Sequence, residues 1–403
     1  MDKALIIFLL TYVVIAIGRP PLFRIDRAGA ALIGASLMIV TGVIDIDTAY
    51  RAIDYRTIVL LFSLMIVVAN LRLSGLFPLV SAFVVRRISS PTLLLYAVVF
   101  MSGSLSALLI NDTVCIAFTP LILAITVRLG LNPVPYLLAL CMASNIGSVA
   151  TITGNPQNIM IGSFSGISYA RFAVKLLPIA VTGLVLCCVM IRVVYRDSFR
   201  TGQILSAPLR YRVHRSLLIK STIVSLVMLL LFLAGVSMTT VAIGGASFLL
   251  ITRRINPDKV YNSIDWRLLL LFAGLFIVVA GVERSGLAKV AIESIGSRTV
   301  GHPVFLVGVS ALLSNLVSNV PAVLLLKPVV AIMPDPETAW LLLAMSSTLA
   351  GNLTILGSIA NIIVVEGARP RVTIGFAEYL KVGVPLTLTT MLAGALWLTL
   401  VPY

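Results

Sequence analysis

Long apolar segments, separated by short polar stretches, make up most of this chain. A helix needs about 20 predominantly apolar residues to cross the roughly 30 Å hydrocarbon core of a membrane, and somewhat shorter segments can be accommodated. We expect membrane-spanning helices in the segments 4–18, 28–44, 58–72, 132–152, 174–195, 216–233, 236–251, 266–281, 337–355 and 376–400. The pattern therefore predicts an all-α integral membrane protein that crosses the membrane many times.

Two further apolar regions, 91–128 and 302–333, are each long enough for two passes but are interrupted in the middle. The interruptions are the polar steps Asn111-Asp112-Thr113 and Ser318-Asn319-Val320-Pro321. Non-helical backbone at membrane depth is tolerated only where protein encloses it or where it lines a cavity. We therefore predict two re-entrant helical hairpins with these polar residues at their tips.

Two of the expected helices also contain breaks, in the segments 132–164 and 337–367. The breaks lie at Gly154-Asn155-Pro156 and at Gly357-Ser358. Proline lacks an amide hydrogen and disfavours helix in the residue before it, while glycine permits dihedral angles that strain other residues. These segments are predicted to be broken transmembrane helices.

The two halves of the chain resemble each other. Segments 53–76 and 264–287, aligned at an offset of 211, are identical at 12 of 24 positions. Polar residues recur further on, as the pairs Asn111 and Asn319, Thr151 and Thr354, Gly154 and Gly357, and Asn158 and Asn361. We count five crossings between Arg56 and Arg267, an odd number, so the second copy is expected to be inverted. Inverted repeats are typical of secondary transporters, whose substrate site lies where the halves meet near the bilayer midplane.

This organisation divides the chain into five parts. They are N-terminal scaffold helices (1–43), a first inverted repeat (44–195), a cytoplasmic linker (196–215), connecting scaffold helices (216–254) and a second inverted repeat (255–403). The densest basic cluster lies around the linker, which places that side in the cytoplasm.

Composition excludes a water-soluble globule, because 59% of the residues are hydrophobic and only 11% are charged. The net charge of +15 resides in short loops, so its partners are expected to be anionic lipid head groups rather than nucleic acid. All four cysteines lie in apolar stretches without paired spacing, which predicts neither disulfides nor a structural zinc site. No cofactor is expected apart from a coupling proton or sodium ion.

Side chains beside the hairpin tips and helix breaks form the candidate substrate site. Helix N-termini there suit an anion or an oxyacid, and exposed carbonyls suit a cation. The candidates are Asn111, Thr113, Asn145, Thr151, Thr153, Asn155 and Asn158 from the first half, and Ser318, Asn319, Thr354, Ser358 and Asn361 from the second. For a single Ser or Thr, a hydroxyl bonded to its own helix backbone is an equally good interpretation.

Two charges lie at membrane depth. Asp112 has no counterpart in the second half, where Val320 takes its place, and a carboxylate there must be paired, protonated or bound to a cation. It is the candidate coupling residue. Lys327 could neutralise Asp112, attract an anion or extend toward the interface. Glu366 lies near Arg369 and is expected to form an interfacial ion pair.

These residues resemble the ion transporter superfamily, in particular its branch of arsenite permeases, citrate permeases and related anion permeases. The resemblance rests on the two hairpin tips and on the string Asn145-Ile-Gly-Ser-Val-Ala-Thr-Ile-Thr-Gly-Asn-Pro-Gln-Asn158. It implies a dimeric scaffold with a mobile transport domain that moves like an elevator. Dicarboxylate members carry a Ser-Asn-Thr step at both tips, and this chain departs from it at both.

Several functions remain open at this stage. The first hypothesis is proton-coupled export of arsenite or antimonite, with amides and hydroxyls binding a mostly neutral acid and with Cys115 and Cys141 as further candidate ligands. Sodium-coupled uptake of a di- or tricarboxylate or another anion, and sodium/proton antiport, are alternatives. A passive channel is disfavoured by the repeats, and an intramembrane enzyme by the absence of a catalytic or metal motif. We expect a multi-pass homodimer in the plasma (inner) membrane of a prokaryote.

Overall fold

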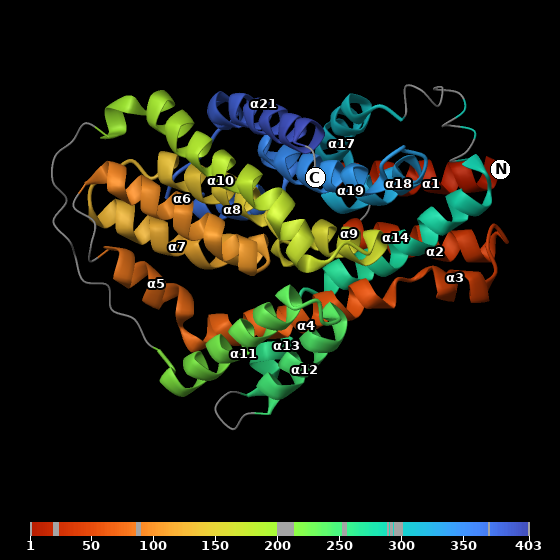
Figure 1. Ribbon diagram of the computed structural model, residues 1–403, viewed down its shortest axis with the longest axis horizontal. Helices are drawn as coiled ribbons and strands as arrows, with labels where there is room; N and C mark the ends of the chain where they lie inside the picture. Colours follow the sequence, from red (N-terminus) through yellow and green to blue (C-terminus); the bar gives the residue numbers. More distant parts are fainter. Residues whose placement is uncertain are drawn as a thin grey trace.

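The computed structural model describes residues 2–18, 24–85, 90–199, 213–251, 256–287, 290, 293, 301–369 and 371–401. These residues form helices joined by short turns, with no strand among them (Figure 1). Most of the expected linker, residues 200–212, lies outside the described part of the chain.

Seven of the described helices are long and apolar enough to cross a membrane: α4 (Tyr55–Ser74), α6 (Pro91–Leu108), α7 (Asn111–Arg128), α10 (Tyr169–Val194), α11 (Arg215–Leu233), α14 (Trp266–Arg284) and α21 (Phe376–Leu400). Shorter helices are α1 (Asp2–Ile17), α2 (Arg27–Val40), α8 (Val134–Ser148), α9 (Pro156–Ser165), α12 (Met238–Leu250), α17 (Pro303–Val317), α18 (Asn319–Ala331), α19 (Pro336–Leu349) and α20 (Ile359–Ala368). The sequence pattern missed three short helices, α3 (Ile46–Ala52), α5 (Leu76–Val85) and α13 (Pro257–Tyr261).

Each expected hairpin is a pair of helices that meet at its polar step. Helix α6 ends at Leu108 and α7 begins at Asn111, with two extended residues between them. Helices α17 and α18 are separated by Ser318 alone, which has φ 77° and ψ 160°. Ser318 is the one described residue other than glycine with a positive φ, and this backbone region is strained for a residue with a side chain.

The two expected helix breaks are also present. Helix α8 ends at Ser148, a 3₁₀ turn covers Ile152–Gly154, and α9 begins at Pro156. In the second half α19 is followed by 3₁₀ turns at Ala350–Asn352 and Ile355–Gly357, and α20 begins at Ile359. A Cβ at Gly154 would lie 2.3 Å from the Ser148 carbonyl oxygen, so the first break needs glycine.

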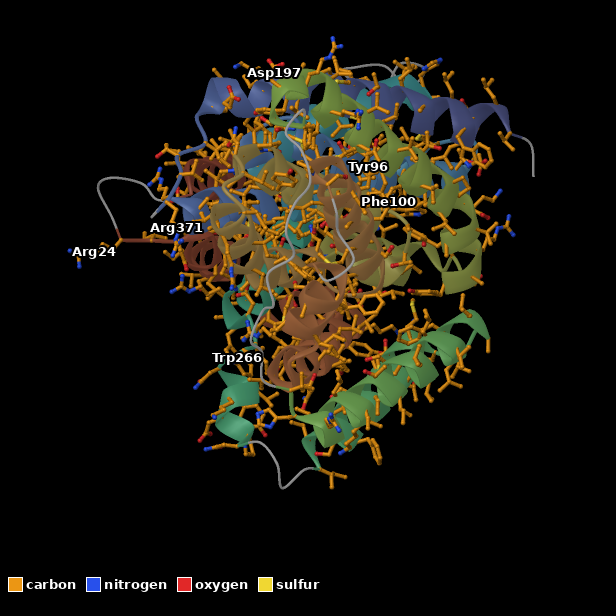
Figure 2. The ribbon with its side chains drawn as sticks, turned by 90° about the vertical axis from the view of Figure 1, so that its left-hand side faces the viewer. Arg24, Tyr96, Phe100, Asp197, Trp266 and Arg371 are labelled. Atoms are coloured by element: carbon orange, nitrogen blue, oxygen red, sulfur yellow. The ribbon has the colours of Figure 1, made fainter. Side chains whose placement is uncertain are left out.

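Packing places the broken helices at the centre and two similar groups of helices around them. Helix α8 packs against α6, α7 and α10, and its residues from Pro135 onward are buried. Helix α4 packs against α11 and α12, and α14 packs in the same way against α1 and α2. In Figure 1, α11, α12 and α13 gather beside α4, apart from α6 to α8. Charged side chains such as Arg24 and Asp197 lie at the outer edge of the molecule (Figure 2).

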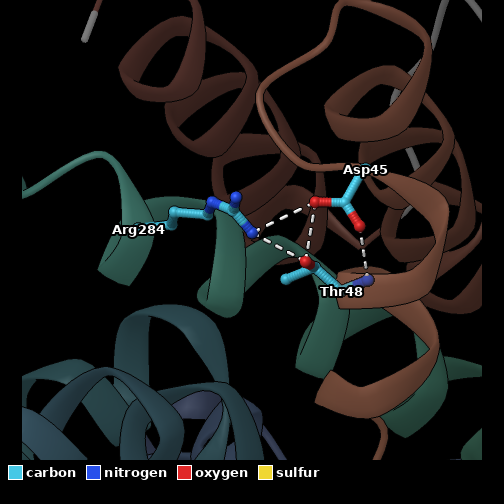
Figure 3. A network of polar contacts seen from close by, with 3 residues as sticks. All are labelled: Asp45, Thr48 and Arg284. Carbon is cyan, nitrogen blue, oxygen red and sulfur yellow. Dashed lines mark hydrogen bonds and ion pairs between the residues drawn. The ribbon is translucent and has the colours of Figure 1, made fainter.

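Helix α3 is tied to the end of α14 by a polar cluster (Figure 3). Arg284 Nη1 lies 3.1 Å from Asp45 Oδ2 and donates to Thr48 Oγ1 at 2.6 Å, while Asp45 Oδ1 accepts from the Thr48 backbone N–H at 2.8 Å. The hydrogen bonds from Thr48, with a smaller contribution from Arg284, lower the pKa of Asp45 from 3.8 to about 2. The cluster therefore holds the start of α3 against the end of α14.

Candidate functional site

The hairpin tip of the first half and the broken helices of both halves meet at the side chain of Asn145 on α8. Its Oδ1 accepts from Asn111 Nδ2 and from Ser358 Oγ, each at 3.0 Å. Its Nδ2 donates to Asn352 Oδ1 at 2.8 Å and to Asn361 Oδ1 at 3.1 Å. Asn145 is 1% exposed, so an amide fully enclosed by protein joins the two halves.

Asn158 and Asn361 bridge the two helix breaks in the same way. Asn158 Nδ2 donates to the carbonyls of Ser148 (3.1 Å) and Thr151 (3.0 Å). Asn361 Nδ2 donates to the carbonyls of Gly351 (2.6 Å) and Thr354 (3.0 Å). Both sets are related by an offset of 203 residues. Carbonyls at a helix end lack partners within their helix, so each asparagine satisfies the backbone that its break leaves open.

A second group of polar side chains extends from this centre to the other hairpin. Asn155 Nδ2 and Gln157 Nε2 donate to Thr348 Oγ1, at 3.2 and 3.1 Å. In the orientation that satisfies its amide, Asn319 donates to the carbonyls of Ser347 and Gly357 and accepts from Gln157 at 3.2 Å. Ser148 Oγ connects the two groups, because it donates to the Asn145 carbonyl and accepts from Asn155. The amides of both halves thus form one network, which we call the amide network.

Three of the predicted threonines join the breaks to neighbouring helices. Thr151 Oγ1 donates to the Ala107 carbonyl of α6, and Thr354 Oγ1 donates to Asn315 Oδ1 of α17 at 2.9 Å. Thr153 Oγ1 lies 3.0 Å from the Tyr169 hydroxyl. The Ser318 side chain does not cap α18. The hydroxyl of Ser318 is therefore outside the network, although its backbone shapes the second tip.

Asp112 and Thr113 face away from the amide network. They line a separate cavity of about 80 Å³ together with Arg72, Ser263 and Asp265. Arg72 Nη2 donates to Ser263 Oγ at 2.7 Å. Because successive helical residues point in different directions, Asn111 and Asp112 lie on different sides of the same tip. The candidate coupling carboxylate and the candidate substrate amides are thus neighbours in sequence that face different spaces.

Lys327 is placed away from Asp112. Its Nζ lies 3.5 Å from Glu283 Oε1 and 5.1 Å from the centre of the Phe164 ring. Lys327 therefore pairs with Glu283, between α18 and α14, and not with Asp112. Glu366 and Arg369 form an ion pair at 3.1 Å.

The thiols of Cys115 and Cys141 are fully buried, at 0% exposure. Cys141 Sγ donates to the Leu138 carbonyl at 3.4 Å. Among the described residues, no three His, Cys, Asp or Glu side chains gather as metal ligands would.

Sequence reasoning missed several members of the amide network. Asn352, Thr348 and Gln157 all make side-chain contacts within it. Thr348 lies 203 residues after Asn145, so extending the internal offset backward along α19 would have found it. Asn352 is matched by Val149 and carries no signal from the repeat; only its position beside Gly351 at a helix end marks it.

The chain is similar to known membrane proteins along nearly its whole length. Residues 12–350 match the family described as citrate transporter. The 46 kDa membrane protein of Mycobacterium leprae is 33% identical over 424 residues, covering 98% of each chain. The silicon efflux transporter of Oryza sativa subsp. japonica is 32% identical over 450 residues, covering 93% of this chain and 92% of that protein.

A solved structure shares the fold. The crystal structure of the YdaH transporter of Alcanivorax borkumensis matches with a TM-score of 0.56 and 16% sequence identity, covering 98% of this chain and 96% of that one. The apolar helices, the family match and the relatives along nearly the whole chain agree with one another. The chain is a multi-pass integral membrane protein that belongs to the citrate transporter family of membrane anion transporters.

Proposed function

We propose that this protein is a secondary active transporter that exports arsenite or antimonite in exchange for protons, by an elevator-type movement of the hairpins and broken helices against the remaining helices. The inverted arrangement of segments 44–164 and 255–367 is part of this proposal. The repeated asparagine bridges at an offset of 203 support it, because matching breaks in two halves are the usual framework of a midplane site.

The observation that carries the choice of substrate is a pair of buried acceptor atoms. Asn111 Oδ1 and Asn158 Oδ1 are enclosed and accept no hydrogen bond from the described residues. Their amide nitrogens are engaged, Asn111 with Asn145 and Asn158 with two carbonyls, which fixes the direction of each oxygen. A buried acceptor without a donor costs about 1–3 kcal/mol. A ligand that carries O–H groups would supply the missing donors.

Neutral oxyacids, with several O–H groups, meet this requirement better than ionised carboxylates do. Arsenous acid is mostly uncharged at pH 7 and has three O–H groups, whereas an ionised carboxylate offers only acceptors. The side chains of the amide network are uncharged, and Lys327 is engaged by Glu283. The rice relative is named for silicon efflux, and dissolved silicon at neutral pH is also a hydroxyl-rich neutral acid. The shared chemistry supports an oxyacid substrate and export.

Asp112 is proposed to carry the exchanged proton. It lines the 80 Å³ cavity with a second carboxylate, Asp265, and with Arg72. A proton bound by Asp112 would remove one of the two negative charges that share this cavity. Its neighbour Asn111 belongs to the amide network, so a single hairpin tip would link protonation to substrate binding.

Uptake of a carboxylate with sodium is the second candidate, because the family is described as citrate transporter. Purified protein in liposomes would separate the two. We expect a pH gradient without sodium to drive arsenite and antimonite, and citrate, succinate and sulfate to be inactive. Counterflow of labelled arsenite would identify a carrier rather than a channel. Sodium-dependent citrate uptake without arsenite transport would overturn the proposal.

The Asp112→Asn variant tests the coupling step. It keeps the shape of the side chain but removes ionisation, so we expect proton-driven arsenite export to fall at least tenfold while exchange of arsenite for arsenite persists. Asp47→Asn, at an exposed position on α3, is the matched control and should transport normally. Normal proton-driven export by Asp112→Asn would show that the carboxylate only caps the hairpin.

A further inference from the structure

Two large cavities open at corresponding places in the two halves. The first, about 510 Å³, is lined by Tyr55 and Arg56 at the start of α4, by the α9–α10 connection and by the α11–α12 turn. The second, about 720 Å³, is lined by Asp265 and Arg267 at the start of α14, by α20, and by described residues at the end of α1 and the start of α2. Arg56 and Arg267 are equivalent at the offset of 211, so the cavities are the same feature formed twice.

Two equivalent residues of the helix breaks, Leu356 and Thr153, differ sharply in exposure, and only Leu356 lines one of these two cavities. Leu356 lines the second cavity and is 62% exposed. Thr153 lies 203 residues earlier, at the matching position of the first break, and is only 2% exposed. The helix break of the second half is therefore open to its cavity, and that of the first half is closed off from its own.

Two aromatic rings account for this closure. Tyr169, at the start of α10, and Phe232, at the end of α11, pack with ring centres 5.4 Å apart. Both line the first cavity, and both also line a smaller apolar cavity of about 160 Å³ that includes Thr153. The rings thus form the boundary between the first cavity and Thr153. Tyr169 is 3% exposed and Phe232 is 4% exposed, which shows that the boundary is tightly packed.

Behind the rings lies a direct connection to the amide network. The Tyr169 hydroxyl lies 3.0 Å from Thr153 Oγ1, which lies 3.3 Å from Thr151 Oγ1. The Thr151 carbonyl accepts from Asn158, one of the two members of the amide network whose amide oxygen has no partner among the described residues. Val372, 203 residues after Tyr169, is not among the described residues that line the second cavity.

We propose that Tyr169 and Phe232 form a gate that closes the first cavity from the amide network, and that the structure is the state in which this gate is shut and the second cavity is open. Opening requires the start of α10 to separate from the end of α11, which frees the path for a small neutral oxyacid. The proposal rests on the transporter function, but its test reads accessibility rather than transport.

Thiol labelling tests the gate. In a background with the four native cysteines replaced, Thr153→Cys should react slowly with a membrane-impermeant methanethiosulfonate, and Leu356→Cys should react readily. Adding Phe232→Ala removes one ring and should raise the rate at Thr153→Cys at least tenfold. Leu230→Ala, on the same helix with a side chain that is 65% exposed, is the matched control and should leave the rate unchanged.

A further cysteine position controls for a general change in accessibility caused by misfolding. Ser163→Cys lines the first cavity in front of the rings and should react rapidly in every variant. If Thr153→Cys already reacts as fast as Ser163→Cys, or if Phe232→Ala raises its rate no more than Leu230→Ala does, the rings are not a gate. Labelling needs no substrate. If the labelling rates change as expected but the protein does not transport arsenite, the proposed substrate is wrong and the gate still stands.

Discussion

Asn158 and Asn361 make the same two backbone bonds but use their amide oxygens differently. Asn361 Oδ1 accepts from Asn145, whereas Asn158 Oδ1 accepts nothing from the described residues. The nitrogen of each residue therefore bonds the backbone of a helix break, and only the Asn158 oxygen lacks a partner among the described residues. The internal repeat therefore identifies the backbone bonds that both asparagines share, and the difference between the two halves identifies the oxygen that we propose binds substrate.

The backbone bonds made by the Asn361 amide predict that Asn361→Ala is less stable than the native protein. Removing the amide leaves the buried Gly351 carbonyl unpaired, at a cost of about 1–3 kcal/mol, while the Thr354 carbonyl keeps its bond from the Gly357 backbone N–H. We expect a clearly lower midpoint of thermal unfolding in detergent. Thr389→Ala removes a hydroxyl that bonds within its own helix at an exposed position, and should change stability by less than about 0.5 kcal/mol. Equal midpoints for the two variants would contradict the bridging role.

Asp45 predicts a pH effect on stability. Its pKa in the folded protein, about 2, is below the ordinary value of 3.8, so folding favours the ionised form. The contribution is present above pH 4 and is lost as pH falls toward 2. We expect the unfolding midpoint of the native protein to drop more steeply over this range than that of Asp45→Asn. Thr48→Val removes the hydroxyl bond but keeps the backbone N–H that also bonds Asp45, so its slope should lie between those of the native protein and Asp45→Asn. A native slope in both variants would refute the assignment.

Side-chain direction is what the sequence could not supply. Asp112 follows Asn111 directly, yet one faces the cavity with Asp265 and the other faces Asn145. The sequence left three roles open for Lys327, and its partner is Glu283, 44 residues earlier on another helix. Both outcomes depend on helix rotation and on which helices pack together, and a hydrophobic pattern as uniform as this one contains little information about either.

At the scale of helices, the sequence was more informative. The polar steps at residues 111–113 and 318–321 and the glycines at 154 and 357 mark points where helices do end and begin. These points were predictable because proline, glycine and paired polar residues act locally on the backbone. Their depth in the membrane stays a prediction. The short helices α3, α5 and α13 were missed because each is too short to show an apolar period.

The second hairpin tip predicts an unusual stabilising substitution. Ser318, with φ 77° and ψ 160°, occupies a region that is essentially reserved for glycine, at a cost of about 1–3 kcal/mol. Ser318→Gly should relieve this strain and, after the entropy that glycine loses on folding, raise stability by about 1 kcal/mol. Ser36→Gly inside α2 is the control and should lower stability by about 1 kcal/mol. A Ser318→Gly protein that unfolds at a lower temperature than the native one would contradict the strain.

At the scale of the whole molecule, the two cavities make the inverted repeat testable. Helix α4 with α11 and α12 borders the first cavity, and α14 with α1 and α2 borders the second. If the repeats are inverted, as we propose, equivalent cavities must open on opposite sides of the membrane. The basic linker predicts that the second cavity faces the cytoplasm and that the first faces the outside.

We therefore expect Ser163→Cys to react with an impermeant thiol reagent only when it is added outside, and Leu356→Cys only when it is added to the cytoplasmic face of inside-out vesicles. Both positions line large cavities, so the thiol reagent should reach either cysteine once it is on the correct side of the membrane. Labelling of both from one face would mean that the halves share an orientation, and the elevator proposal would fall with the inversion. If Ser163→Cys were labelled only from the cytoplasmic face and Leu356→Cys only from outside, the repeats would still be inverted. Only the sidedness predicted from the basic residues would be wrong.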